Sequence, residues 1–154
     1  MRGSARRKTL AARERSGVIV VDTNVVASLL FPGQHTGAAR AAFTHDPLWA
    51  APRLWRSEFR NVLALYMRQR HISLTQALEL QETAEALLQG REYAVSSGDV
   101  LTLAMESGHS PYDCEFVAVA RALGVALVAS DRRLLSTFPH NVVDVRVFAS
   151  GGGP

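Results

Sequence analysis

The sequence is nearly free of cysteine and has no long apolar run. Cys114 is the only cysteine among the 154 residues, which excludes an internal disulfide and a cysteine-rich zinc site. No segment approaches the roughly 18 consecutive apolar residues that a membrane helix requires, and the basic first residues lack the apolar core of a secretion signal. These absences predict a protein of a reducing compartment, the cytoplasm, with no place in a membrane.

Lysine is also nearly absent, and the positive charge is unevenly placed. Lys8 is the only lysine, and residues 1–17 hold six of the 17 basic residues against Glu14 alone. The net charge of +3 therefore comes from this segment. We expect residues 1–17 to form a disordered basic tail, residues 18–148 a single folded domain, and the glycine-rich residues 149–154 a flexible end.

Short apolar segments alternate with segments of helical periodicity. The expected strands are residues 18–21, 48–51, 92–95, 124–130 and 141–148. Helices are expected over 23–31, 35–43, 54–70, 73–90, 98–108, 111–123 and 131–138. Apolar strands that alternate with helices are typical of a parallel sheet covered on both faces. The sequence therefore predicts an α/β fold, a three-layer α/β/α sandwich with a central, mainly parallel sheet.

Four acidic residues occupy matching places in this pattern. Asp22 and Asp131 directly follow predicted strands, and Glu58 and Asp113 lie near the starts of predicted helices. Strand ends and helix starts meet at the carboxyl edge of a parallel sheet, so we expect the four acids to face one crevice. Neighbouring carboxylates raise one another's pKa unless a cation compensates their charge. Because hard cations prefer oxygen ligands, the pattern predicts that these acids bind Mg²⁺ or Mn²⁺.

Each acid also has an ordinary structural interpretation. Asp22 and Asp131 are good helix N-caps, Asp113 suits the first turn of a helix, and Glu58 could belong to a solvated face. A single acid of this kind would indicate nothing. Four acids at one edge of one sheet are harder to explain by capping and favour a shared site.

Arginines close to these acids are candidates to bind the phosphates of a nucleic acid, because the planar guanidinium matches phosphate geometry. They are Arg56, Arg60, Arg132 and Arg133. The alternative is that these arginines only form a solvated helix surface. Tyr112 and Trp55 are the aromatic residues best placed to stack on bases, although a Trp on such a helix is more often part of the core.

Three segments together resemble the PIN domain, the fold of metal-dependent ribonucleases, and particularly the VapC-type toxins of prokaryotic toxin–antitoxin pairs. They are "VIVVDTNVVASLL", "LWRSEFRNVL" and "SPYDCEFVAVARALGVALVASDRRL". The resemblance covers residues 18 to about 148 and agrees in order, spacing and flanking apolar runs. It implies that the catalytic and metal-binding acids are Asp22, Glu58, Asp113 and Asp131, with Thr23, Asn24 and Ser130 as supporting groups.

The chain departs from the family pattern in two places. Ser130 stands where threonine is common, but it keeps the hydroxyl group. Cys114 and Glu115 stand where small or apolar residues are frequent. Glu115 would add a fifth acid near the site, and we expect it to face solvent because an unpaired acid is rarely buried.

The resemblance implies an Mg²⁺- or Mn²⁺-dependent endoribonuclease that hydrolyses RNA phosphodiester bonds and is the toxin of a type II toxin–antitoxin pair. It also implies a cognate antitoxin protein and a homodimer as partners. The predicted helices over 54–89 carry more apolar side chains than one face of a sheet would cover, which suggests an interface. The residues concerned are Tyr66, Met67, Leu74, Leu80, Leu87 and Leu88. The alternative is that the two helices pack only on each other and on the sheet.

Other interpretations fit less well. A receiver-type domain needs a lysine after a late strand, but Lys8 is the only lysine, and a haloacid-dehalogenase-like phosphatase needs an acid at the position of Asn24. The serious alternative is a non-catalytic PIN-like module that binds RNA or protein. A costly cluster of four carboxylates argues against binding without chemistry.

Overall fold

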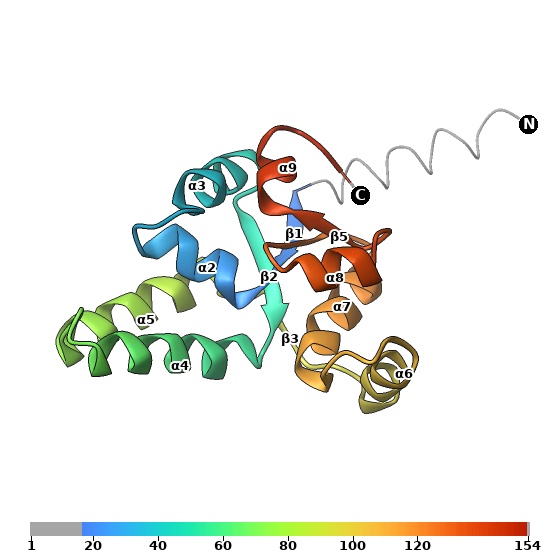
Figure 1. Cartoon of the computed structure of the whole chain (residues 1–154), viewed down its shortest axis with the longest axis horizontal. Coiled ribbons are helices and arrows are strands. Elements are labelled where there is room, and N and C mark those ends of the chain that lie inside the picture. Colours follow the sequence, from blue (N-terminus) through green and yellow to red (C-terminus); the bar gives the residue numbers. More distant parts are fainter. Residues whose placement is uncertain (1–16, 154) are drawn as a thin grey trace, which may run out of the picture.

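The computed structural model describes residues 17–153, and its centre is a five-stranded parallel sheet (Figure 1). The strands are β1 (Val18–Val21), β2 (Leu48–Pro52), β3 (Glu92–Tyr93), β4 (Leu127–Ala129) and β5 (Val142–Asp144), in the spatial order β3-β2-β1-β4-β5. Every paired strand runs parallel to its neighbour. The predicted parallel sheet is therefore confirmed, while the tail predicted for residues 1–17 falls almost wholly outside the described residues.

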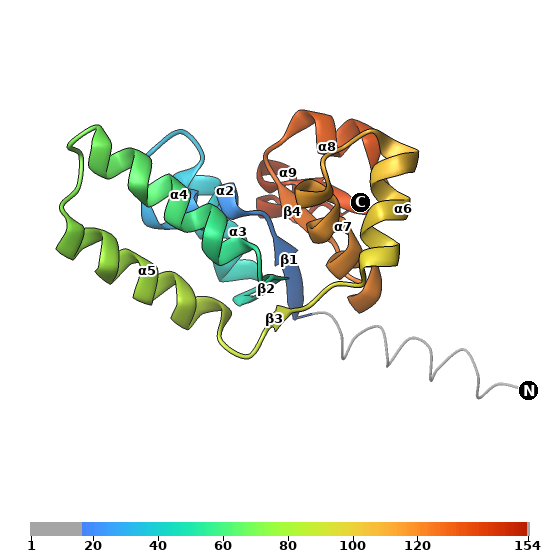
Figure 2. The ribbon, with the colours of Figure 1, turned by 90° about the horizontal axis from the view of Figure 1, so that it is seen from below.

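Helices cover both faces of the sheet, as Figure 2 shows with α4 and α5 to one side and α6 and α7 to the other. The helices of the described part are α2 (Thr23–Leu30), α3 (Thr36–His45), α4 (Trp55–Arg68), α5 (Leu74–Leu88), α6 (Ser97–Ser107), α7 (Pro111–Leu123), α8 (Arg132–Thr137) and α9 (Val145–Ala149). The three-layer α/β/α sandwich is thus confirmed. Within residues 17–153, no helix is both long enough and apolar enough to cross a membrane.

Local sequence signals set the starts of the helices that matter for the site. Ser110 caps α7 by accepting a hydrogen bond from the Asp113 N–H, and Pro111 occupies the first helical position, where its missing N–H costs nothing. The predicted capping box of α5 is present, with Ser73 and Gln76 bonded reciprocally. These caps fix where each helix begins and so where its first-turn side chains lie.

The order of the strands creates a switch point in the sheet. The chain passes from β1 to β2 and β3 on one side, and then crosses to place β4 and β5 on the other side of β1. The carboxyl ends of β1 and β4 are therefore neighbours from which the chain departs toward opposite sides. In open α/β sheets such a point leaves a crevice in which ligands bind. Asp22 follows β1 and Ser130 follows β4 at this crevice.

The prediction of a strand over residues 141–148 is only half correct. β5 ends at Asp144, whose side chain accepts a hydrogen bond from the Arg146 N–H and so begins α9. The apolar residues of this segment suggested a strand, but Val145 and Phe148 are three residues apart and bury one helical face. Strands β3 and β4 are also shorter than predicted.

The glycines after Phe148 lie at the end of α9, within the segment predicted to be flexible. Ala149 is the last residue of α9, and the Gly151 and Gly152 N–H groups donate to the carbonyls of Phe148 and Val147. A side chain at Gly152 would collide with Val147. The glycines therefore close the helix end, at least as far as Gly152.

The apolar surplus predicted for α4 and α5 is mostly absent from the surface. Five of the six residues named for an interface lie in or against the core, because the two helices pack on each other, on α2 and on the sheet: Tyr66, Met67, Leu80, Leu87 and Leu88. Leu74 is the exception and is exposed. The exposed apolar side chains of this pair are Leu65, Leu74 and Leu78, and sequence periodicity did not single out Leu65 or Leu78.

Candidate active site

Asp22 is buried at the carboxyl end of β1 and caps α2. Its Oδ1 accepts a hydrogen bond of 2.8 Å from the Val25 N–H, and the residue is only 7% exposed. Burial raises the pKa of Asp22 to about 7, and the negative charges of Asp131 and Glu58 add to the rise. Hydrogen bonds from the backbone of Val25 and Ser130 act in the opposite direction. Asp22 is thus a carboxylate that needs a positive charge nearby in order to stay ionised.

Glu58 lies in the first turn of α4 and faces the start of α2. The Thr23 hydroxyl donates to Glu58 Oε1 over 3.3 Å, which orients the carboxylate. Burial raises the pKa of Glu58, and the charges of Asp113 and Glu115 raise it further. Glu115 is therefore not simply solvent-facing as predicted, because it is half-buried and its charge acts on Glu58.

Asp131 is the N-cap of α8. Its Oδ1 accepts from the N–H groups of Arg133 and Leu134 at 2.8 and 3.3 Å. Like Asp22, it uses one carboxylate oxygen as a cap. Capping and a functional role are therefore compatible here, since each carboxylate carries a second oxygen.

Asp113 lies in the first turn of α7 and is partly exposed. Its Oδ2 is 3.5 Å from Nδ1 of His109, a histidine whose side chain is 1% exposed. The other ring nitrogen of His109 is 2.8 Å from the Thr137 hydroxyl at the end of α8. His109 was not identified as a site residue from the sequence, because its contact with α8 depends on the packing of segments that lie far apart along the chain.

The four acids share one edge of the sheet without forming one tight cluster. The charge of Asp22 interacts with those of Asp131 and Glu58, and the charge of Glu58 interacts with that of Asp113. Among residues 17–153, however, no three His, Cys, Asp or Glu side chains are close enough to hold a metal ion together. The four acids thus lie near one edge of the sheet, but within the described residues they do not form a shell around one point.

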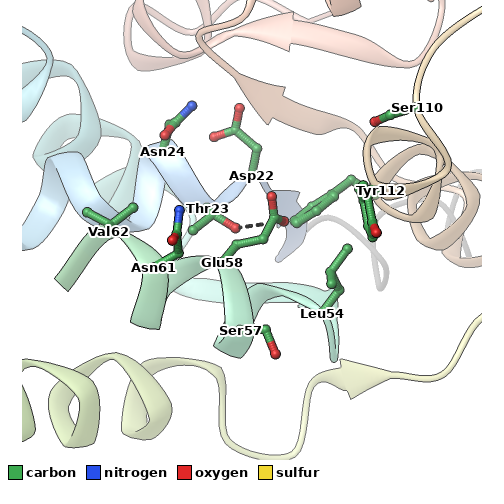
Figure 3. Close-up of a pocket in the computed structure, with 11 residues that line it drawn as sticks. Asp22, Thr23, Asn24, Leu54, Ser57, Glu58, Asn61, Val62, Ser110 and Tyr112 are labelled. Carbon is green, nitrogen blue, oxygen red and sulfur yellow. Dashed lines mark hydrogen bonds between the residues drawn. The ribbon is translucent and has the colours of Figure 1, made fainter. Parts of the chain in front are cut away.

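Two of the acids line an open cavity of about 510 Å³. Figure 3 shows Asp22, Thr23 and Glu58 as neighbours in this cavity, with the Thr23 hydroxyl directed at Glu58. Asn24, Ser110 and Tyr112 also line it, and so does Asn61, which follows Glu58 by one helical turn. The spacing of Glu58 and Asn61 was the one sequence signal that could have identified Asn61.

The arginines divide into two groups. Arg56 is held by two acids, Glu92 at 2.6 Å and Glu85 at 2.9 Å, and so joins α4 to β3 and α5. Arg60, Arg132 and Arg133 are exposed, and Arg133 also donates to the carbonyl of Gly108 over 3.3 Å. The prediction that Arg56 binds phosphate is therefore not supported by its surroundings.

The two aromatic candidates also differ. Trp55 is fully buried and its indole N–H donates to Glu92, so it offers no surface to a base. Tyr112 is 63% exposed and borders the acidic cavity. Only Tyr112 is placed to stack on a ligand.

Comparisons with known proteins agree with this architecture. The PIN domain family model matches residues 19–138. Ribonuclease VapC3 of Pyrobaculum aerophilum is 30% identical over 125 residues, which cover 79% of this chain and 95% of that protein.

Two solved structures have the same fold. PAE2754 from Pyrobaculum aerophilum superposes with a TM-score of 0.69 at 22% identity, covering 86% of this chain and 94% of its own. FitAcB from Neisseria gonorrhoeae superposes with a TM-score of 0.63 at 18% identity, covering 82% and 97%. The family match, the VapC3 relative and the acids at the sheet edge lead to one conclusion: this chain belongs to the PIN domain family.

Proposed function

We propose that this protein is an Mg²⁺- or Mn²⁺-dependent endoribonuclease that hydrolyses RNA phosphodiester bonds. The observation that carries the proposal is the buried carboxylate of Asp22 at the switch point of the sheet, with Glu58 and Asp131 as its charged neighbours. Within the described residues, no arginine forms an ion pair with any of these three acids. Carboxylates gathered without a basic partner are suited to a cation.

The donor atoms fit a hard divalent cation. The candidate ligands are carboxylate oxygens, with hydroxyl and amide oxygens of Thr23, Asn24 and Ser130 nearby, and no thiolate or imidazole belongs to this set. Mg²⁺ is commonly held by one or two carboxylates, with water and substrate phosphate filling its other positions. The lack of three converging acids is consistent with such an open site. When bound, the cation acts as a Lewis acid for the attack of water on phosphorus.

The side chains of the chain itself position the reacting groups. We propose that Asp22, Glu58, Asp113 and Asp131 hold the cation directly or through water. The bond from Thr23 fixes Glu58, and the cap bonds fix Asp22 and Asp131. A carboxylate that is already oriented loses little freedom when it binds a cation, which favours binding.

Exposed arginines at the rim would hold the phosphates on either side of the scissile bond. Arg132 and Arg133 begin α8, directly after Asp131, and Arg60 lies on α4 within one turn of Glu58. Guanidinium groups bind phosphate in a bidentate manner, so they fix the register of the RNA as well as its affinity. Arg56 is left out of this set because Glu85 and Glu92 already neutralise it.

The same proposal includes the biological setting. The resemblance to VapC-type toxins implies the toxin of a type II toxin–antitoxin pair, active in the cytoplasm and bound by a cognate antitoxin protein. Homodimer formation is also part of the proposal. The exposed side chains of Leu65, Leu74 and Leu78 support a protein contact on α4 and α5, because they are large apolar groups at the surface.

The test is cleavage of mixed RNA by the purified chain with Mg²⁺, with Mn²⁺ and with EDTA, beside Asp22→Asn. Asp99→Asn is the matched control, because Asp99 is an exposed first-turn acid of α6, away from the acidic cavity. Cleavage should require the metal, fall at least about 100-fold in Asp22→Asn and stay unchanged in Asp99→Asn. If the chain bound RNA but cleaved it under none of these conditions, the non-catalytic module would be favoured instead.

A further inference from the structure

A second cavity, of about 300 Å³, lies beside the acidic one. It is bounded by α2, by the loop of residues 32–35 and by α4. The two cavities share Asn24 and Val62, and Ser130 also borders the second. Asn24 is two residues from Asp22, and Ser130 directly precedes Asp131. A chain molecule held at the acids can therefore extend into this second cavity.

The lining of the second cavity differs in chemistry from the acidic site. No Asp, Glu, Lys or Arg is among the residues that line it. Its polar side chains come from Asn24, Ser28, Gln34, His35, Thr36 and Ser130. Apolar walls come from Ala27, Phe31, Val62 and the ring of Tyr66. A phosphate would find no cation there and a metal ion no carboxylate, so the cavity suits a neutral group with polar edges and apolar faces.

The walls are held in place by the protein itself. Tyr66 of α4 stacks on Phe31 at the end of α2, with ring centroids 4.5 Å apart and the planes at 14°. The Thr36 hydroxyl donates to the Phe31 carbonyl over 2.7 Å and accepts from the Gly33 N–H over 2.9 Å. The loop is thus closed on itself, which makes the cavity preformed. Thr36 is used in this way, and Asn24 and Ser130 belong to the acidic site already described. The polar groups that remain for a ligand are therefore the Ser28 hydroxyl, the Gln34 amide and the His35 ring, whose buried Nδ1 has no hydrogen-bond partner among the described residues.

We infer that this cavity, the neutral pocket, binds the nucleobase next to the scissile phosphate and selects it through Ser28 and Gln34. The inference rests on the proposed ribonuclease function. Nucleobases are flat and neutral, and they differ from one another in the donors and acceptors along their edges. A hydroxyl and an amide can read those edges, since both donate and accept hydrogen bonds.

The experiment measures base preference at the cut site. Single-stranded RNAs with a randomised stretch are cleaved in Mn²⁺ by the wild type and by Ser28→Ala and Gln34→Ala, and the new ends are sequenced. Gln69→Ala is the matched control, because Gln69 is an exposed glutamine at the end of α4 and lines neither cavity. Binding of short RNAs that differ at one base is measured in parallel in EDTA, where no cleavage confuses the affinity.

We expect the wild type to prefer one base, or one pair of bases, at a position adjacent to the cut. Each pocket variant should reduce that preference about tenfold, which is the effect of one lost hydrogen bond. On the disfavoured sequences, each variant should cut at nearly the rate at which the wild type cuts the same sequences. The control should keep the wild-type profile. Alanine suits the helix interior at position 28, so Ser28→Ala should fold normally.

One outcome would overturn the inference while leaving the nuclease intact: an active wild type whose cleavage profile is unchanged in both pocket variants. A wild type that neither cuts nor binds RNA would overturn the proposed function itself, and the inference with it.

Discussion

Asp22 carries two roles that make opposite demands on its charge. As the cap of α2 it accepts a hydrogen bond from Val25, which favours the carboxylate form. Its burial favours the neutral acid, and the charges of Asp131 and Glu58 act in the same direction, so that its pKa lies at about 7. Without a cation, the protein therefore keeps a destabilising charge in its interior above neutral pH.

This conflict predicts that Asp22→Asn stabilises the metal-free protein at pH 8. The pKa of Asp22 is higher in the folded state than in the unfolded chain, so its favourable contribution is complete below about pH 4 and is lost as the pH rises through 7. Asparagine caps helices as well as aspartate and carries no charge. In EDTA, urea unfolding should show the variant more stable by about 1 to 3 kcal/mol at pH 8, and little different at pH 4.

Added Mn²⁺ provides the control for that prediction. It should stabilise the wild type and leave Asp22→Asn nearly unchanged, because only the wild type offers a buried carboxylate to the ion. A variant that is less stable than the wild type at pH 8 in EDTA would contradict this account of Asp22. The Asp22 carboxylate would then stabilise the fold, whereas residues of a functional site commonly lower the stability of the protein.

The sequence identified residues whose role depends on local position and missed those whose role depends on distant partners. Asp22 and Asp131 were identifiable because they directly follow strands, and parallel topology then places them together. His109 was not, since its ring is held by Thr137, 28 residues away. The role of Arg56 was misjudged for the same reason, because its partner Glu92 lies 36 residues further along the chain.

At the scale of the elements, α7 and α8 are linked through His109. The Thr137 hydroxyl donates its one proton to the Arg133 carbonyl, so it accepts a hydrogen bond from Nε2–H of His109. The other side of that ring faces Asp113 at 3.5 Å. The link therefore helps to set the spacing between Asp113 on α7 and Asp131 at the start of α8.

Thr137→Val should weaken metal binding by loosening this link. Valine keeps the shape of threonine but leaves the buried Nε2–H of His109 without an acceptor. We expect the Mn²⁺ concentration for half-maximal cleavage, and the dissociation constant from calorimetry, to rise about tenfold. Ser136→Ala is the control, because Ser136 also donates to the Arg133 carbonyl but does not contact His109. Equal Mn²⁺ concentrations for half-maximal cleavage in Thr137→Val and Ser136→Ala would count against a positioning role for Thr137.

A second link between elements involves Glu92 of β3, which accepts hydrogen bonds from Arg56 and Trp55 of α4. The hydrogen bonds from Arg56 are the main reason that the pKa of Glu92 lies below its usual value, and the bond from Trp55 adds to this effect. Its contribution to stability is therefore present above the unfolded pKa of about 4.5 and is lost as the pH falls through the folded pKa.

Glu92→Gln should thus destabilise the protein at pH 7 by about 1 kcal/mol, a modest value because Arg56 is partly exposed to solvent. The difference from the wild type should shrink at pH 3, because the stabilisation from the lowered pKa of Glu92 is progressively lost as the pH falls below 4.5 and toward the folded pKa. Urea unfolding at pH 7 and at pH 3 measures the stability difference between Glu92→Gln and the wild type at each pH. The exposed Glu79 of α5 supplies the control Glu79→Gln, which should have no effect at either pH. A loss that is equal at pH 7 and pH 3 would show that the charge of Glu92 does not matter.

At the scale of the whole molecule, the fold was predictable and the ends of its elements were not. The alternation of apolar runs with helices was sufficient for a parallel three-layer sandwich, because few other arrangements bury such strands on both faces. The sequence of 141–148 was misread because apolar residues fill both a short strand and the helix after it. The boundary between the strand and the helix lies at Asp144, which caps α9, and this cap is recognisable only in the folded structure.

Under the proposed function, the distribution of charge over the whole molecule decides how it would hold RNA. Beyond residue 17 the chain has eleven basic and thirteen acidic residues, so this part has a net charge of −2 and does not attract RNA as a whole. If the protein is the proposed ribonuclease, RNA binding by this part depends on a few exposed arginines that are near the acids in the sequence. Arg132 is fully available for this, since it is exposed at the start of α8.

Arg132→Ala should weaken the binding of single-stranded RNA and reduce its dependence on salt. Each phosphate contact contributes about 0.7 to the slope of log affinity against log salt for single strands, so the slope should become shallower by roughly that amount. Arg56→Ala is the contrasting variant, because it removes an equal charge that is already neutralised by Glu85 and Glu92. Its salt slope should match the wild type while its unfolding free energy falls. If the two variants changed the slope equally, RNA would be responding to the net charge of the molecule, and the rim arginines would have no special place in the site.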